Sequence, residues 1–177
     1  APGAPGAAGP AVELARGIAC TAAGDGGVHL EWAVEEKRIS GQDKMHVSPS
    51  FQLPTPAGIS LPFKLVLHAA VGKRSGKGAQ GFKSAEGWAR AELKCCENVP
   101  AGAEVVAHVQ FGLGAGGAAR GLRGPVAVDL VRQSCCRLPP GEDLWHLPAA
   151  VDRASRSVAV CVRVRFAAAA CLTTWSA

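Results

Sequence analysis

Tyrosine is absent from this sequence of 177 residues, and methionine occurs only once. The length suits one domain with room for a substantial core. Although 48% of the residues are hydrophobic, alanine and glycine supply much of the chain. The core must therefore be built economically, mostly from valine, leucine, phenylalanine and tryptophan.

Long apolar runs are also missing, which excludes a membrane-spanning helix of about 20 residues. The longest candidate, 164–172, is too short and is interrupted by Arg165. No charged segment precedes an apolar one at the start, so we expect no secretory signal. The chain lacks an initiator methionine and begins APGAPGAAGP. We interpret this start as the mature end left by a removed targeting segment, favouring an organelle such as the plastid over the cytoplasm, or as a tag or partial chain.

Helical periodicity is a third absence, because no segment of 10–15 residues spaces its apolar side chains at intervals of three and four. Strict alternation takes its place. In the segment 157–166, SVAVCVRVRF, four valines and Phe166 occupy every second position, and arginines occupy two of the positions between them. This pattern predicts a strand with one buried face and one wet face.

The same alternation recurs along the chain and predicts further strands. We expect them at 28–35, 47–53 (an edge or bulge, because of Pro49), 61–70, 88–95, 104–113 and 125–131. The segment 12–21 fits a helix or a strand, and 144–152 is a short helical or irregular segment. Strands joined by turns pair antiparallel, and two stacked sheets cover each other's apolar faces. The prediction is an all-β, antiparallel β-sandwich of about eight strands at 28–166, with an N-terminal arm and turn (1–27) and a C-terminal tail (167–177), both arms being flexible.

Several short patterns occur in an order that is typical of one known family. They are Trp32-x-Val34, Ser48-Pro49-x-Phe51, 63–67 (FKLVL), 91–95 (AELKC), 105–111, and Leu144-Trp145 before 158–164. In strand order and spacing, the region 28–166 resembles the MATH (TRAF-type) β-sandwich. That resemblance implies an eight-stranded antiparallel sandwich that binds short peptides or packs into oligomers, without catalysis. Phe63 stands where the family commonly has tryptophan, and only Trp145 represents its aromatic-rich stretch. The Ala/Gly/Arg-rich style also resembles proteins of GC-rich algal genomes such as those of dinoflagellates.

A basic loop and two tryptophans are the candidate partner-binding residues. The loop at 72–83 could form a basic finger, and Trp88 is out of phase with its strand's inward side chains, which predicts exposure beside that loop. Trp175 lies in the C-terminal tail. The alternatives are that the loop is merely solvated and that Trp88 covers a sheet edge. The candidate residues are Lys73, Arg74, Lys77, Lys83, Trp88 and Trp175.

Motifs for cofactors, metals or catalysis are weak. The GxGxxG match at 112–117 has no helix after it, and the loop at 72–78 departs from phosphate-loop spacing. The two vicinal cysteine pairs lack zinc-finger spacing, none of the five histidines sits in a metal spacing, and no GxSxG motif occurs. The seven cysteines are an odd number, so we expect mostly reduced thiols and leave one disulfide open. We predict no cofactor, no metal and no enzymatic activity.

The function that fits these observations is a non-enzymatic protein-interaction or structural accessory subunit. It would dock on other protein subunits of a larger assembly, with an organellar or photosynthetic complex as the suggested setting. The contacts would be the arm 1–11, the loop 72–83 with Trp88, and the tail 167–177. The alternative is an anionic-ligand or lipid-headgroup binding module that uses the loop 72–83, which would allow peripheral membrane association. The mild net charge of +5 suits either partner, and we expect no nucleic-acid binding.

Overall fold

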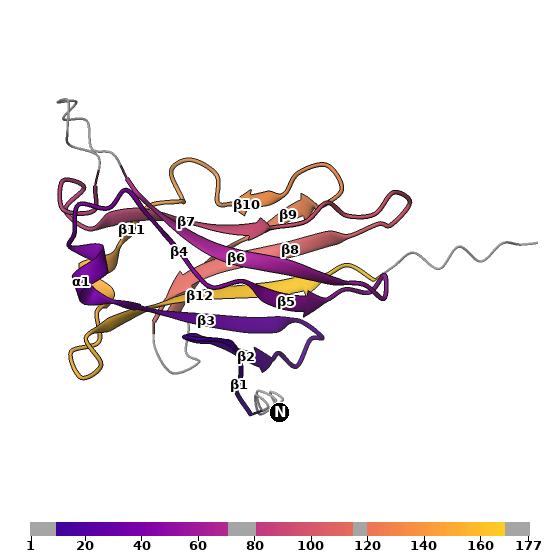
Figure 1. The fold of residues 1–177 in the computed structure, drawn as a ribbon, viewed down its shortest axis with the longest axis horizontal. Coiled ribbons are helices and arrows are strands. Elements are labelled where there is room, and N and C mark those ends of the chain that lie inside the picture. The colour runs from indigo at the N-terminus through magenta and orange to yellow at the C-terminus, as the bar shows by residue number, and fades with distance from the viewer. Residues whose placement is uncertain (1–9, 71–80, 115–119, 169–177) are drawn as a thin grey trace, which may run out of the picture.

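The structure is a computed structural model that describes residues 10–70, 81–114 and 120–168. Within them the chain forms two antiparallel β-sheets, which Figure 1 shows as stacked layers. In spatial order, sheet A contains β1 (Val12–Ala15), β2 (Ile18–Ala22), β3 (Val28–Glu35), β12 (Ser157–Phe166), β8 (Val106–Leu113) and β9 (Arg120–Asp129). Sheet B contains β10 (Cys135–Arg137), β7 (Trp88–Cys95), β6 (Ser60–Ala69) and β4 (Met45–Val47), with β5 (Phe51–Pro54) paired to β6 and β11 (Trp145–His146) paired to β7.

The predicted all-β antiparallel architecture is confirmed, with more strands than expected. Two of the extra strands arise from interruptions. The short strands β4 and β5 pair with successive parts of β6, and β10 and β11 pair with successive parts of β7. Counting each interrupted pair as one position, sheet B has four positions, and the part of sheet A beyond β1 and β2 also has four, formed by β3, β12, β8 and β9.

The N-terminal region differs from the expectation of an arm up to residue 27. Residues 12–22 form β1 and β2, and β2 pairs with β3 from Ile18 opposite Trp32 to Ala22 opposite Val28. Ile18 is fully buried, so this hairpin belongs to the sandwich. The pattern of 12–21 was ambiguous because an edge hairpin has few buried positions, and its pairing with β3 decides the conformation. Residues 1–9 and 169–177, the two ends of the expected arms, lie outside the described residues.

The core lies between the sheets and contains the side chains that alternation assigned to it. In β12, at the centre of sheet A, the four valines at 158, 160, 162 and 164 are buried. Sheet B contributes Phe63, Leu65 and Leu67 from β6 and Ala89, Ala91 and Leu93 from β7. Burying a valine or leucine side chain contributes about 1.5–3 kcal/mol. This layer therefore supplies much of the driving force that holds the sheets together.

The segment 47–53 forms two strands where one was expected, and Pro49 lies at the break. Ser48 spans the gap: its backbone N–H donates to the carbonyl of Leu65 (2.9 Å), and its side-chain oxygen accepts from the N–H of Leu65 (2.9 Å). The chain therefore remains attached to β6 although proline has no N–H to donate.

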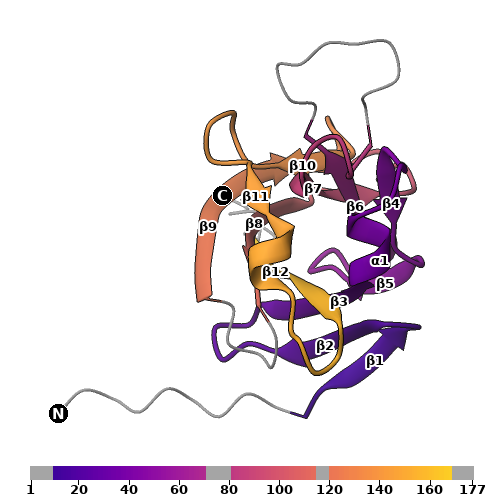
Figure 2. The same ribbon diagram turned by 90° about the vertical axis from the view of Figure 1, so that its left-hand side faces the viewer.

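Two short helices lie at the same end of the sandwich. The helix α1 (Glu36–Ile39) joins β3 to β4, and the 3-10 helix η1 (Leu147–Ala150) leads from β11 towards β12. Figure 2 shows both at the end that faces the viewer. The buried ring of His46 ties α1 down, because its Nε2 lies 2.7 Å from the carbonyl oxygen of Arg38 and its ring stacks on Phe82 at 4.9 Å. The segment 144–152, expected to be short helical or irregular, contains the two-residue strand β11 followed by η1.

Candidate functional site

The outer face of sheet B carries large apolar side chains that water reaches. Because successive strand residues point to opposite faces, the residues that alternate with the buried core residues along each strand point outward. Three of them are Met45, Val47 and Trp88, which are 49%, 41% and 43% exposed. We name the outward side chains of this region the Trp88 face; it consists of Met45, Val47, His68, Trp88, Arg90 and His146.

Strand register places the members of the Trp88 face side by side. Met45 on β4 lies opposite His68 on β6, and His68 lies opposite Arg90 on β7. On the far side of β7, His146 of β11 lies opposite Trp88, and the two ring centroids are 4.9 Å apart with the rings inclined at 45°. The Trp88 face therefore runs across four strands, with Trp88 held against a histidine ring.

On the strands that form the Trp88 face, the charged residues are mainly basic. Arg90 Nε lies 2.6 Å from Asp143 Oδ2, and that carboxylate is buried beneath the surface. Glu92 is largely covered too, with an oxygen 3.9 Å from His68 Nε2. Lys64 and Lys94 lie directly opposite each other on the same outer face. The strands therefore present apolar and basic groups, while the exposed carboxylates of Asp43 and Glu86 lie in the loops just before β4 and β7.

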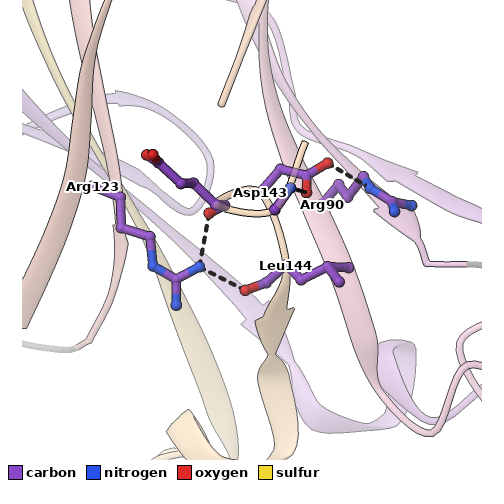
Figure 3. A network of polar contacts seen from close by, with 6 residues as sticks. Arg90, Arg123, Asp143 and Leu144 are labelled. Carbon is purple, nitrogen blue, oxygen red and sulfur yellow. Dashed lines mark hydrogen bonds and ion pairs between the residues drawn. The ribbon is translucent and has the colours of Figure 1, made fainter. Parts of the chain in front are cut away.

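A polar network that includes Arg123, Asp143 and Arg90 anchors the loop before β11 (Figure 3). Arg123 reaches across from β9 and donates through Nη1 to the carbonyl oxygens of Glu142 (2.8 Å) and Leu144 (2.7 Å). Its guanidinium also lies over the Trp145 ring, 3.7 Å from the centroid. Because Trp145 precedes His146, this clamp from sheet A supports the histidine that contacts Trp88.

A tight turn at 81–87 connects Lys83 with Trp88. The backbone N–H of Lys83 donates to the carbonyl of Gly41 (2.7 Å), and that of Trp88 donates to Ala85 (2.9 Å). Gly81 is necessary here, since a side chain at that position would collide with the backbone of Gln42. The turn therefore presents an exposed Lys83 close in sequence to Trp88 on a well-anchored backbone.

The structure places only some of the residues predicted to bind a partner. Trp88 is exposed on the outward phase, as predicted, and Lys83 is exposed beside it. Lys73, Arg74, Lys77 and Trp175 lie outside the described residues. Sequence reasoning missed Met45, Val47 and His146. No local signal pointed to the first two, because apolar residues at 45 and 47 on either side of a histidine predict the opposite burial from the one observed.

A hollow of about 540 Å³ adjoins this face along β7. Its lining includes Glu92 on β7 and two arginines, and consists of Glu92, Val126, Arg132, Gln133, Ser134, Cys135 and Arg137. The hollow extends the basic, outward surface towards the edge where β9 of sheet A approaches β10 of sheet B, which Figure 2 shows near each other.

The thiols show little sign of chemical activation. Six cysteines lie in the described parts of the chain, and all six are free. Burial raises the pKa of Cys136 and that of Cys161 to about 12. A nucleophilic cysteine needs the opposite shift, because the thiolate is the reactive form. Each vicinal pair has one more buried member, Cys95 and Cys136, as alternation requires.

Three histidines on outward-facing strand positions are only partly exposed. His29, His68 and His108 lie on the outward phase, but all three are half-buried. Nε2 of His29 and Nε2 of His68 are buried and make no hydrogen bond within the described structure. Leaving such an atom unpaired costs about 1–3 kcal/mol. The alternation pattern gives the face on which a side chain lies, but not how far its neighbours cover it.

Comparison with known proteins adds no identification. Among the described residues, no helix combines the length and apolarity that crossing a bilayer would take. No family model matches this sequence, and no curated protein matches it significantly.

Proposed function

We propose that this protein is a non-enzymatic interaction subunit that docks on another protein subunit through the Trp88 face. The observation that carries the proposal is the exposure of Met45, Val47 and Trp88 on one face of a sheet whose backbone is firmly held. Scattered apolar residues are ordinary on a protein surface, but apolar groups gathered on one face mark an interaction site. Tryptophan is enriched among the residues that dominate binding energy, and methionine adapts to varied partner surfaces.

The chemistry of the Trp88 face defines the partner. Among the charged side chains on its strands, those that water reaches are Arg90, Lys64 and Lys94, whereas Glu92 and the neighbouring Asp143 are largely covered. Electrostatic complementarity then favours an acidic protein segment that carries an apolar anchor. The raised pKa of the buried thiols supports a role in binding rather than catalysis.

We further propose that the sandwich is of the MATH type. Support comes from the four strand positions in each layer beyond the β1–β2 hairpin, since the sequence resemblance implies eight strands. Peptide binding and oligomer packing would be the corresponding modes of interaction.

The test replaces Trp88 by alanine and measures binding to the partner that co-purifies with the wild-type chain from its native source. We expect a loss of affinity of about 30-fold or more, equivalent to the roughly 2 kcal/mol that defines a dominant interface residue. Val131→Ala and Val12→Ala are matched controls, because both valines are exposed but lie away from the Trp88 face. They should leave the Kd unchanged. An unchanged Kd in Trp88→Ala would refute this docking face.

A second measurement distinguishes docking on a protein from the alternative function, binding of an anionic ligand or lipid headgroup. Flotation with anionic lipid vesicles, at low and high salt, compares the wild-type chain with a variant in which Lys73, Arg74, Lys77 and Lys83 are alanine. Docking through the Trp88 face predicts no salt-sensitive flotation. Flotation that the loop variant abolishes would instead establish a lipid-headgroup module.

A further inference from the structure

A second cluster of chemically active groups lies on the outer face of sheet A, away from the Trp88 face. His29 and Glu31 are two residues apart on β3, so both point outward. Cys161 on β12 lies opposite Glu31 in the strand register. One donor atom from each residue, a ring nitrogen, a carboxylate oxygen and the sulfur, lies within 4.8 Å of the other two.

The residues of this cluster are shielded from much of the water: His29 and Glu31 are half-buried. Cys161 is fully buried, and its Sγ lies 3.2 Å from the carbonyl oxygen of Gly114. Nε2 of His29 is shielded from water and has no hydrogen-bond partner within the described residues. An imidazole nitrogen beside a thiol and a carboxylate, with little water to satisfy it, is the environment that a bound cation relieves.

We propose that His29, Glu31 and Cys161 bind one zinc ion that links β3 to β12. Sulfur, imidazole nitrogen and carboxylate oxygen are the donors that zinc takes, with bonds of about 2.0–2.3 Å. Donors of a tetrahedral site are then roughly 3.5 Å apart, so side-chain rotations from the present spacing close the site. A thiolate ligand favours zinc over magnesium or calcium.

The local charge balance agrees with a divalent ion. Zinc binding displaces the thiol proton of Cys161 to water, and the resulting thiolate together with an ionised Glu31 neutralises the two positive charges of the ion. An opposing charge comes from Arg163, which lies opposite His29 in the register. Arg163 is already engaged, because its Nη2 is 2.8 Å from Asp25 Oδ2. Three protein ligands leave one coordination position for water, so the site holds the ion without requiring a fourth side chain.

The experiment uses the full chain with Cys20, Cys96, Cys135 and Cys171 replaced by serine, which leaves the buried Cys95 and Cys136 as the only thiols besides Cys161. After treatment with a chelator, the protein is titrated with Zn²⁺ calorimetrically and with Co²⁺ spectroscopically. We expect one ion per chain and a thiolate-to-cobalt charge-transfer band. Absence of stoichiometric binding, or a cobalt spectrum without that band, would overturn the proposal.

Ligand variants then assign the donors. Cys161→Ser, His29→Ala and Glu31→Gln should each weaken Zn²⁺ binding by at least about 10-fold, since even outer-shell partners of metal sites have effects of that size. His108→Ala is the matched control: His108 is half-buried on the same face, on the neighbouring strand β8, and outside the cluster. Circular dichroism checks folding, and if Cys161→Ser fails to fold, His29→Ala and Glu31→Gln decide. Affinities in these variants equal to that of the control would refute the site.

Discussion

Cysteine placement shows how directly strand alternation acts on single residues. In each vicinal pair one thiol points into the core and its neighbour points out, so Cys95 and Cys136 are buried while Cys96 is exposed. Burial disfavours the thiolate and raises the pKa of Cys136 to about 12. The ionisation of one residue is therefore coupled to the stability of the whole fold.

The first prediction concerns alkaline pH. The unfolded chain releases the Cys136 proton near pH 9, whereas the folded chain keeps it up to about pH 12. The contribution of Cys136 burial to the free energy of unfolding is therefore fully present below pH 9, and it is lost as pH rises towards 12. The free energy of unfolding should fall by at most about 1.4 kcal/mol per pH unit in this window. Urea denaturation from about pH 7 to about pH 10.5, which spans the ordinary thiol pKa, measures the slope.

Variants isolate the contribution of that thiol. Cys136→Ala should show a shallower alkaline decline than the wild-type chain, because the titrating group is gone. Cys96→Ser serves as the control, since Cys96 is exposed and meets water in the folded and unfolded states. Equal slopes for Cys136→Ala and the wild type would show that burial of Cys136 does not govern alkaline stability.

At the scale of elements, the two sheets are joined by more than apolar packing. Arg123 of β9 belongs to sheet A, but its guanidinium binds two carbonyls of the loop before β11 and covers Trp145. β11 is only two residues long and pairs with the end of β7. A strand this short needs outside support, and Arg123 provides it.

The second prediction is that Arg123→Ala lowers the free energy of unfolding by about 1–3 kcal/mol, through two unpaired carbonyls and the lost cation–π contact. Arg132→Ala is the control, because Arg132 is exposed and pairs with Asp129 three residues away. It should change stability by less than about 1 kcal/mol. Arg123→Lys should fall between them, since lysine keeps the charge but loses the planar fork. Urea unfolding curves of the three variants decide; equal losses for Arg123→Ala and Arg132→Ala would contradict the clamp.

At the scale of the whole molecule, the β1–β2 hairpin extends sheet A beyond β3. Ile18 packs in the core, and β2 pairs with the outer edge of β3 along five residue positions. Without that hairpin, β3 would become an edge strand beside a partly opened core. Exposed edge strands promote pairing between chains.

The third prediction compares two truncations. Deleting 1–23 should lower the urea midpoint and produce soluble oligomers or aggregates, because Ile18 and the partner of β3 are lost. Deleting 1–9 should leave both properties unchanged, since the described strand pairing begins at Val12. Light scattering after size-exclusion chromatography and urea unfolding are the measurements. A stable, monomeric chain after deletion of 1–23 would confine the essential sandwich to 28–166.

Alternation alone determined the fold class and the face on which most strand residues lie. The inward valines of β12 and the outward Trp88 could be assigned from the amino-acid sequence, because the two-residue period is a property of each strand by itself. The same period reports nothing about which strand lies alongside. Sequence analysis therefore missed that β1 and β2 join the sheet, that Met45 lies opposite His68, and that Cys161 meets His29 and Glu31.

Those relations were decided only by the tertiary structure. Strand order and register depend on long-range packing, and a neighbour 130 residues away in the chain, as Cys161 is from Glu31, leaves no local mark in either segment. In this protein, alternation within each strand specifies the architecture, whereas the sites depend on which strands pair and in which register. The physical reason is that a strand buries its apolar face against any suitable layer, whereas a binding or metal site requires particular side chains at particular register positions.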